Sequence, residues 1–475
     1  MHRKVFFLGG ALIAAVTTGW QIANENLWPS FAISCPLFLW MISSRFGVRS
    51  DAFLAGLVMA GYLIGGRGFA QLSLPKLPIL PGELVLAIGM AVVGWEAVRS
   101  RVVPWQRDAL NGALLAWLSF GVVRFGVDAR VHGLVALRDF AVVYYALFFF
   151  LAQAWWADSQ RRLWVGGCLS AGFAIGALTF IAFARWPEVV VSLFSINGVP
   201  LIFIKSDVQA GLLVAGTFWF ASRYATTRSL GWLALALMSL IGVVFSNSRA
   251  GLLSLLAVVI WILACRQFRL IRPLLVPCAL GAALLLLAPV ITQTPLENSL
   301  AFRFYESIAS VTDLGGERTY KSVDLGDKSD NNQFRLIWWK SVAAETWSEG
   351  RWIGLGFGHD LADQFVRTYY PQGSDEFHSR SPHNYLITLF GRTGIVGVVL
   401  FGLCLSLIAA RTWQAGRLAA CDRGSLEAFV LWIGAWGILV SACFGVVLEG
   451  PMGATIFWSL MGMANASAKT TSSEP

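Results

Sequence analysis

The feature that most restricts the fold of this sequence is a long series of apolar segments, each close to the length that crosses a lipid bilayer. A spanning helix needs about 20 mostly apolar residues. Fourteen segments approach this length: 5–23, 28–43, 50–65, 79–98, 108–124, 135–157, 163–184, 207–223, 229–247, 249–266, 271–291, 384–411, 426–446 and 451–466. Because 28–43, 50–65 and 451–466 are short, we expect an all-α polytopic membrane protein with about 12 to 14 transmembrane helices.

The composition agrees with this class of protein. Hydrophobic residues make up 56% of the chain and charged residues 13%, whereas soluble domains carry about 25% charged residues. The net charge of +9 is typical of basic cytoplasmic loops, so it does not indicate a nucleic-acid partner. The seven cysteines lie in apolar runs or short basic loops, and their spacing predicts neither a disulfide framework nor a metal cluster.

The positions of Lys and Arg set the expected orientation. With the N-terminus inside, every inside loop holds at least two basic residues, while several outside links hold one or none. The N-terminal apolar run is too long for a cleaved signal peptide. The predicted division is 1–291 as N-terminal transmembrane helices, 292–383 as a large outer loop, 384–466 as C-terminal transmembrane helices and 467–475 as a polar tail.

The outer segment 292–383 is unusually long for a link without structure, which favours a functional role. Within it, Gln333 to Glu345 is typical of an amphipathic helix, and Pro371 to Ser381 of a loop. A second outer link, 185–207, is apolar enough to dip back into the bilayer. The tail from Ser467 is polar and rich in Ser and Thr, so we expect it to be disordered.

His383 is the strongest candidate for a functional residue. It lies in SPHNYLITLFGRTGIVG, Ser381 to Gly397, where the long polar segment ends and an apolar one resumes. Histidine has the side-chain pKa nearest neutral pH, so it can accept or donate a proton at the membrane surface. The alternative is that His383 and Asn384 only cap the following helix, and the spacing alone leaves both interpretations open.

Arg249, in SNSRAGLL from Ser246 to Leu253, is placed by a short turn at the same outer surface. A fixed guanidinium there can bind an anionic ligand, and Gly251 with its small neighbours leaves room for the ligand to approach. The alternative is an interfacial arginine whose side chain extends to lipid headgroups.

Arg138 and Asp139 open an apolar segment in LRDF, and Arg124 lies across the same outer link. An ionisable residue at the membrane is a functional candidate, so both arginines are candidate ligands of a substrate. The alternative is that they pair with other residues or cap a helix.

Arg335 precedes Trp338 and Trp339 and leads to GLGFG, Gly354 to Gly358. The glycines allow a tight backbone loop, but no strand precedes them, so they do not predict a nucleotide site. The tryptophans suit stacking on a sugar, although interfacial anchoring is the commoner role.

Together these residues favour transfer to an acceptor hydroxyl from a phosphate-bearing leaving group. Arginine matches phosphate oxygens with its planar fork, and a neutral histidine takes the proton of the acceptor. Without a nucleotide-binding motif, a lipid-linked donor is expected. The histidines at 2, 132, 359 and 378 lack a repeated ligand spacing, so neither a metal nor another cofactor is expected.

Three short motifs, in this order, resemble the O-antigen ligase and polysaccharide polymerase family: SRAGLL at 248–253, the segment from Arg335 to GLGFG, and PHNYL with the GIVG that follows. The hydropathy layout is similar over nearly the whole chain. The resemblance implies a GT-C-like fold and a metal-independent inverting glycosyltransferase of the bacterial inner membrane, with a periplasmic active site. It also implies a glycan donor on undecaprenyl diphosphate and a glycan or lipid A-core acceptor.

Residue by residue, Arg249 matches the essential arginine of the family and His383 its essential histidine, while Arg138 matches in less distinctive surroundings. Leu386 stands where relatives often have an aromatic residue, which bears on the choice of acceptor. The remaining candidates for binding the diphosphate or the glycan are Arg335, Asn384 and Arg124.

The sequence leaves open whether the chain is a ligase, a polymerase or a protein O-glycosyltransferase. The alternative outside this class is a glycolipid flippase or another multi-span transporter. A transporter is expected to show inverted repeats or broken helices with polar residues at the bilayer midplane. The sequence shows no internal repeat, and its candidate residues lie at the outer surface instead.

Overall fold

The computed structural model describes residues 45–467, except for 46, 73–78, 197–198, 247, most of 294–322 and 370–378. This part of the chain is almost entirely helical, and its one sheet joins two short antiparallel strands, β1 (Ser195–Ile196) and β2 (Val199–Pro200). The prediction of an all-α polytopic membrane protein is confirmed. The predicted spans 5–23 and 28–43 and the polar tail from 468 onward lie outside the described residues.

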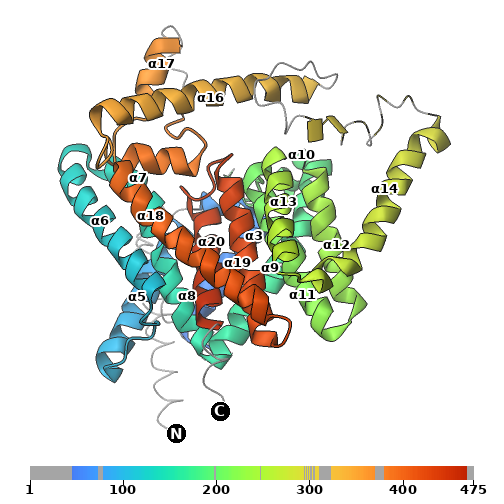
Figure 1. Cartoon of the computed structure of the whole chain (residues 1–475), viewed down its shortest axis with the longest axis horizontal. Coiled ribbons are helices and arrows are strands. Elements are labelled where there is room, and N and C mark those ends of the chain that lie inside the picture. Colours follow the sequence, from blue (N-terminus) through green and yellow to red (C-terminus); the bar gives the residue numbers. More distant parts are fainter. Residues whose placement is uncertain are drawn as a thin grey trace, which may run out of the picture.

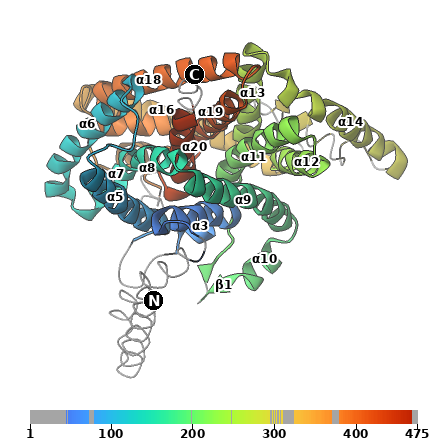
Figure 2. The same ribbon diagram turned by 90° about the horizontal axis from the view of Figure 1, so that it is seen from below.

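The centre of the molecule is a group of helices that bury Ala, Leu, Val, Phe and Trp side chains against one another. They are α3 (Ser50–Gly65), α8 (Leu147–Ala157), α9 (Ser159–Arg185), α11 (Ser206–Thr227), α13 (Arg249–Ala264), α19 (Arg423–Ala442) and α20 (Pro451–Ser467). α11 packs on α19, α20 on α8, and α3 on α9 (Figures 1 and 2). Small residues permit this approach, because a side chain at Gly462 would overlap the carbonyl group of Phe149.

Further helices surround this centre: α4 (Arg67–Ala70), α5 (Pro81–Ser100), α6 (Ala109–His132), α7 (Leu134–Tyr144), α12 (Leu230–Phe245), the 3₁₀ helix η1 (Phe268–Leu270), α14 (Arg272–Thr292) and α18 (Tyr385–Leu418). α14 leans away from the bundle at one edge (Figures 1 and 2). α18 is kinked at Gly394, whose φ of +63° and ψ of −161° are not helical.

All twelve predicted apolar segments that fall within the described residues form helices. Six helices are long and apolar enough to cross a membrane, and the pair α7 and α8, bent by 46°, makes a seventh if it is one span. Three more helices, α3, α12 and α13, are apolar but shorter. The structure therefore supports a multi-pass protein, while the full number of spans stays a prediction.

The outer segments cover one end of the bundle. α16 (Val323–Glu349) lies across this end, with α17 (Asp363–Tyr369) on its outer side (Figure 1). The predicted amphipathic helix Gln333 to Glu345 is part of α16, and its Trp338 packs in a small apolar cluster with Phe365. The link 185–207 forms α10 (Pro187–Leu193) and the β1–β2 hairpin. Most of the predicted loop Pro371 to Ser381 lies outside the described residues.

Candidate functional site

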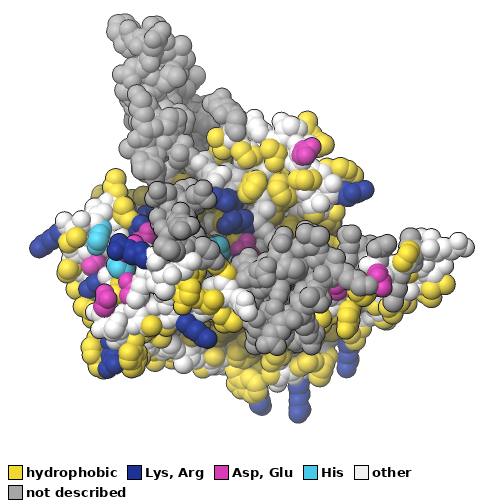
Figure 3. All heavy atoms as spheres, turned by 90° about the horizontal axis from the view of Figure 1, so that it is seen from above, with side chains coloured by type: hydrophobic (Ala, Val, Ile, Leu, Met, Phe, Trp, Pro, Cys, Tyr) yellow, Lys and Arg dark blue, Asp and Glu magenta, His cyan; other side chains and the backbone are white. Residues whose placement is uncertain are grey.

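A cavity of about 470 Å³ lies at the end of the bundle where α4, α11 and α18 begin. Its size suits a small-molecule site. On the face of the molecule next to α16, histidine, basic and acidic side chains gather on the left among apolar ones (Figure 3). The cavity wall includes two of the predicted site residues, Arg138 and His383. The structure therefore brings together residues that are 245 positions apart.

His383 lies just before α18 and has a left-handed backbone with φ +56°. Residues other than glycine rarely adopt this backbone conformation, and it persists only where surrounding contacts fix it. The His383 N–H donates to Ser381 Oγ at 3.4 Å, and the ring Nε2 lies 3.2 Å from Ser379 Oγ. From α16, the indole N–H of Trp339 donates to the Pro382 carbonyl at 2.6 Å.

The electrostatic surroundings keep the His383 ring neutral. Burial lowers the pKa of His383 to about 4, and the positive charges of Arg335 and Lys205 act in the same direction, while Asp207 opposes them. Near neutral pH the imidazole is therefore unprotonated, which is the form that can accept a proton.

The helix-cap interpretation holds for Asn384 and not for His383. Asn384 Oδ1 accepts hydrogen bonds from the N–H groups of Leu386 at 3.0 Å and Ile387 at 3.2 Å, as an N-cap residue does. Asn384 is not among the residues that line the cavity. The geometry therefore gives the predicted substrate-binding role of Asn384 no support and assigns it the start of α18.

Three basic side chains line the cavity and form no ion pair with any described residue: Arg138, Arg67 and Lys205. Arg138 comes from α7, Arg67 is the first residue of α4, and Lys205 precedes α11. Backbone pairing places the last two at the same wall, because the Phe203 N–H donates to the Gly65 carbonyl at 3.1 Å.

Arg67 and Lys205 were missed by sequence analysis. Each is one of two basic residues in a mostly apolar link between predicted spans, which was an available signal. Their meeting could not be predicted, because the two residues are far apart in the chain and meet through a single backbone bridge, Gly66 to Phe203. Glu449, also in the cavity wall, was missed in the same way.

Arg335 and Arg249 lie beside the cavity and do not line it. Arg335 Nη1 donates to the Phe444 carbonyl at 2.8 Å. Burial lowers the pKa of Arg335, the charge of Asp207 raises it, and the charge of Arg249 lowers it further. Because Arg335 also acts on the pKa of His383, the two predicted arginines belong to the electrostatic surroundings of the site.

The start of α13 positions Arg249. Ser248 is the N-cap residue, and its Oγ accepts from the Gly251 N–H at 3.3 Å. A Cβ at Gly251 would lie 2.7 Å from the Ala210 Cβ on α11. The expectation that Gly251 leaves room for a ligand is therefore corrected: this glycine lets α13 pack closely on α11.

Arg124 is held by contacts within the protein. Its Nε lies 3.1 Å from Asp128 Oδ2, and its Nη2 donates to the Gly354 carbonyl at 3.4 Å. Asp128 in turn accepts from the Phe357 N–H at 2.7 Å. Arg124 does not line the cavity, so the geometry places this predicted ligand in a clamp on the glycine loop, Gly354 to Gly358.

The glycine loop is held by further charges. Its three glycines have positive φ values of +78°, +97° and +98°, which explains why glycine is needed there. Asp139 Oδ2 accepts from the Gly358 N–H at 2.9 Å and pairs with Arg392 at 2.9 Å and Arg380 at 3.5 Å. Asp139 therefore ties α7 to the loop and to α18, and both Asp139 and its neighbour Arg138 line the cavity.

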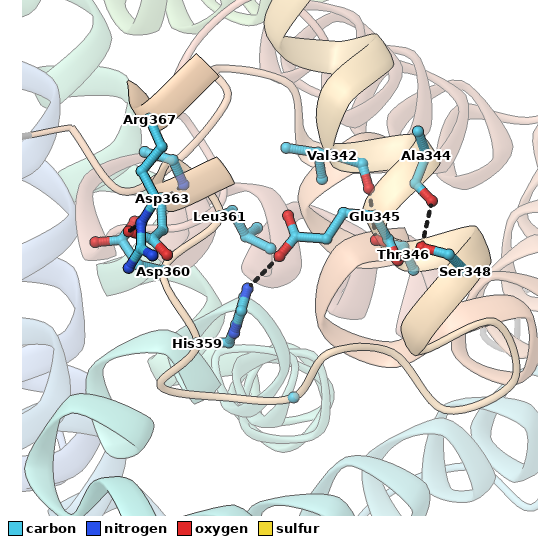
Figure 4. A network of polar contacts seen from close by, with 12 residues as sticks. Val342, Ala344, Glu345, Thr346, Ser348, His359, Asp360, Leu361, Asp363 and Arg367 are labelled. Carbon is cyan, nitrogen blue, oxygen red and sulfur yellow. Dashed lines mark hydrogen bonds and ion pairs between the residues drawn. The ribbon is translucent and has the colours of Figure 1, made fainter. Parts of the chain in front are cut away.

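A second polar pair joins the residue after the glycine loop to α16, and neither of its members lines the cavity. His359 Nε2 is 2.8 Å from Glu345 Oε1, and the two residues join the loop to α16 (Figure 4). Among the described residues, no group of three or more His, Cys, Asp or Glu side chains is arranged to hold a metal ion. The pair is an internal connection of the outer segment.

The fold and the cavity define a multi-pass membrane protein with a basic site, which contains a histidine, at one end of its helix bundle. The family model described as O-antigen ligase matches residues 233–402. This match supports the O-antigen ligase family as the one that the chain resembles, and the resemblance seen in its motifs is confirmed. The match includes Arg249, Arg335 and His383 but ends before Glu449 and begins after Arg138. Among curated proteins, the comparison finds none that matches.

Proposed function

We propose that this protein is a membrane glycosyltransferase that moves a glycan from undecaprenyl diphosphate to an acceptor hydroxyl at the periplasmic face of the bacterial inner membrane. The acceptor is lipid A-core for a ligase or a growing glycan for a polymerase, and both stay open. The observation that carries the proposal is one cavity that combines a neutral histidine with three cations that pair with no described carboxylate, Arg138, Arg67 and Lys205.

The three cavity cations suit the diphosphate of the donor. As the bond between the sugar and the diphosphate breaks, the leaving group gains negative charge. Positive groups already in position stabilise that charge more than they stabilise the intact donor, and this difference lowers the barrier. The fork of Arg138 binds two phosphate oxygens at once, whereas Lys205 acts as a point charge.

His383 is the proposed general base. The acceptor oxygen attacks the anomeric carbon, its proton passes to the His383 ring, and the electron pair of the broken bond leaves with the diphosphate. This single displacement inverts the anomeric configuration and uses no metal. The bound diphosphate brings negative charge beside His383, so we expect it to raise the low pKa of the ring towards the working pH.

Arg249 is proposed as a second contact for the diphosphate, at the side of the cavity next to Arg335. It lies in the segment matched by the family model, and its charge acts on Arg335 and so on the site. Arg335 is proposed to raise the positive potential there rather than to bind the donor, since its guanidinium is hydrogen-bonded to Phe444.

The test is transfer by the purified full-length protein, using lipid-linked glycan extracted from a strain that lacks it. Formation of a new glycosidic bond, detected by mass spectrometry, is the expected result. Movement of the glycolipid between leaflets of a vesicle without a new bond supports the flippase alternative and contradicts the proposal. Glycan analysis of the deletion strain then separates the branches: loss of attachment to lipid A identifies a ligase, and loss of chain length a polymerase.

A further inference from the structure

Glu449 is a buried carboxyl group in the wall of the same cavity, in the link between α19 and α20. Thr388 Oγ1 donates to Glu449 Oε1 at 2.8 Å, and Ser381 Oγ lies 3.5 Å from Thr388 Oγ1. Burying a carboxylate is costly unless hydrogen bonds or opposite charges compensate it. A buried carboxyl group in a cavity wall is therefore a candidate for a functional role.

The hydrogen bonds of Glu449 lead to His383. Thr388 gives its hydroxyl proton to Glu449, so its oxygen remains to accept the Ser381 hydroxyl at 3.5 Å. Ser381 Oγ in turn accepts the His383 N–H at 3.4 Å. Glu449 is thereby connected, through the side chains of Thr388 and Ser381, to the backbone of His383, which has the left-handed φ angle.

A left-handed histidine needs such support. A non-glycine residue in this conformation costs about 1–3 kcal/mol and persists only where its surroundings fix it. Trp339 holds Pro382 on one side and the Asn384 cap fixes the helix on the other. The Ser381 contact restrains the His383 N–H itself, and Glu449 orients Ser381 through Thr388.

We propose that Glu449 is a positioning residue for glycan transfer: through Ser381 and Thr388 it holds His383 in the backbone conformation that turns the imidazole into the cavity. Glu449 itself touches neither the donor diphosphate nor the reacting atoms. The inference rests on the proposed function of His383 as the base. It predicts that the removal of Glu449 slows the chemical step and leaves donor binding, through the cavity cations, intact.

Glu449→Leu and Glu449→Gln, in the purified full-length protein, test the proposal with the extracted lipid-linked glycan as donor. Gln keeps an oxygen that accepts hydrogen bonds, so we expect its kcat within about threefold of the parent. Leu removes the acceptor, and we expect kcat to fall about 10- to 100-fold with an unchanged KM for the donor, as for a misplaced catalytic group. An unchanged kcat for Glu449→Leu, or equal losses for Leu and Gln, overturns the proposal.

Ser381→Ala keeps the test decisive if Glu449→Leu does not fold. It removes the hydroxyl that joins Glu449 to His383, and we expect a loss of kcat of about tenfold, again without a change in the donor KM. Where Glu449→Leu folds, it is expected to have no further effect in the Ser381→Ala background, and an added loss contradicts the pathway through Ser381. His383→Ala is assayed in parallel. If it stays active, the proposed function fails; if it is inactive while both Glu449→Leu and Ser381→Ala are normal, only this inference fails.

Discussion

Two sets of basic residues at the same end of the molecule differ in their partners. The paired set, Arg124, Arg380 and Arg392, contacts carboxylates and backbone carbonyls of the glycine loop. The cavity set, Arg67, Arg138 and Lys205, lines the open cavity, as Arg380 and Arg392 also do, but forms no ion pair within the described part of the chain. The charge of the paired set is used inside the protein, whereas the charge of the cavity set is not compensated by a described carboxylate. Ion-pair partners, rather than position in the sequence, separate the arginines that hold the glycine loop from the basic residues proposed to bind the donor.

The largest effect is expected in the paired set, from Arg392→Met. Arg392 is 3% exposed and pairs with Asp139 at 2.9 Å. Its removal leaves the buried Asp139 carboxylate with only the Gly358 N–H and the longer pair to Arg380, so we expect the free energy of unfolding to fall by about 3 kcal/mol. Thermal unfolding in detergent measures this. Arg367→Met is the control, because its pair with Asp363 is exposed and is worth about 1 kcal/mol or less. Equal losses for both variants would show that the paired set does not hold the loop.

In the cavity set the expected loss is of activity and not of fold. Arg138→Ala should lower kcat by about 10²- to 10³-fold, as the loss of one transition-state contact does in other enzymes. Its unfolding midpoint should stay that of the parent. Arg130→Ala, an exposed arginine on α6, is the matched control and should keep full activity. A fully active Arg138→Ala would remove this residue from the diphosphate site.

A smaller effect is expected for Arg249→Lys. Lysine keeps the charge beside Arg335 but lacks the planar fork, so we expect transfer to slow by about tenfold, and Arg249→Ala to be slower still. Donor affinity is measured alongside by titration with the extracted glycolipid. Parental activity in Arg249→Lys would favour the interfacial interpretation, in which the residue only contacts headgroups.

The pH dependence should report the low pKa of His383. The neutral ring is the active form, so kcat/KM, which reflects the free enzyme, should stay level as the pH falls below 6.5 and decline only near pH 4. The acid limb of kcat should lie at higher pH, because the bound diphosphate raises the pKa of His383. An acid limb of kcat/KM near pH 6.5 would contradict the burial of the ring.

The same group affects stability. The His383 ring binds its proton more tightly in the unfolded chain than in the folded one, so its contribution to stability is present above pH 6.5 and is lost as the pH falls towards 4.

The helices were predictable because their signal is local. Apolar segments of about 20 residues identified every described bundle helix, and the polar boundary before α18 pointed to His383. The side of the membrane on which the candidates gather stays a prediction from the spacing of basic residues between spans.

Partner choice was not predictable, because it depends on contacts between distant segments. Nothing near Arg124 in the sequence shows that the glycine loop, about 230 residues later, will bind it. Lys205 and Arg67 looked like isolated charges until the bridge between Gly66 and Phe203 brought their segments together. Asn384 caps α18 and His383 lines the cavity because the backbone at His383 has a positive φ angle, and no residue pattern predicted that angle.

The central claim is that His383 performs chemistry while its neighbour Asn384 builds the helix, and the pair of substitutions His383→Ala and Asn384→Ala tests it. We predict that His383→Ala lowers kcat by at least about 10²-fold with donor binding and unfolding unchanged. Asn384→Ala should lose about 1 kcal/mol of stability and keep kcat within a few-fold. If His383→Ala instead transfers glycan at the parental rate while its helix is destabilised, His383 is the structural residue and the assignment is wrong.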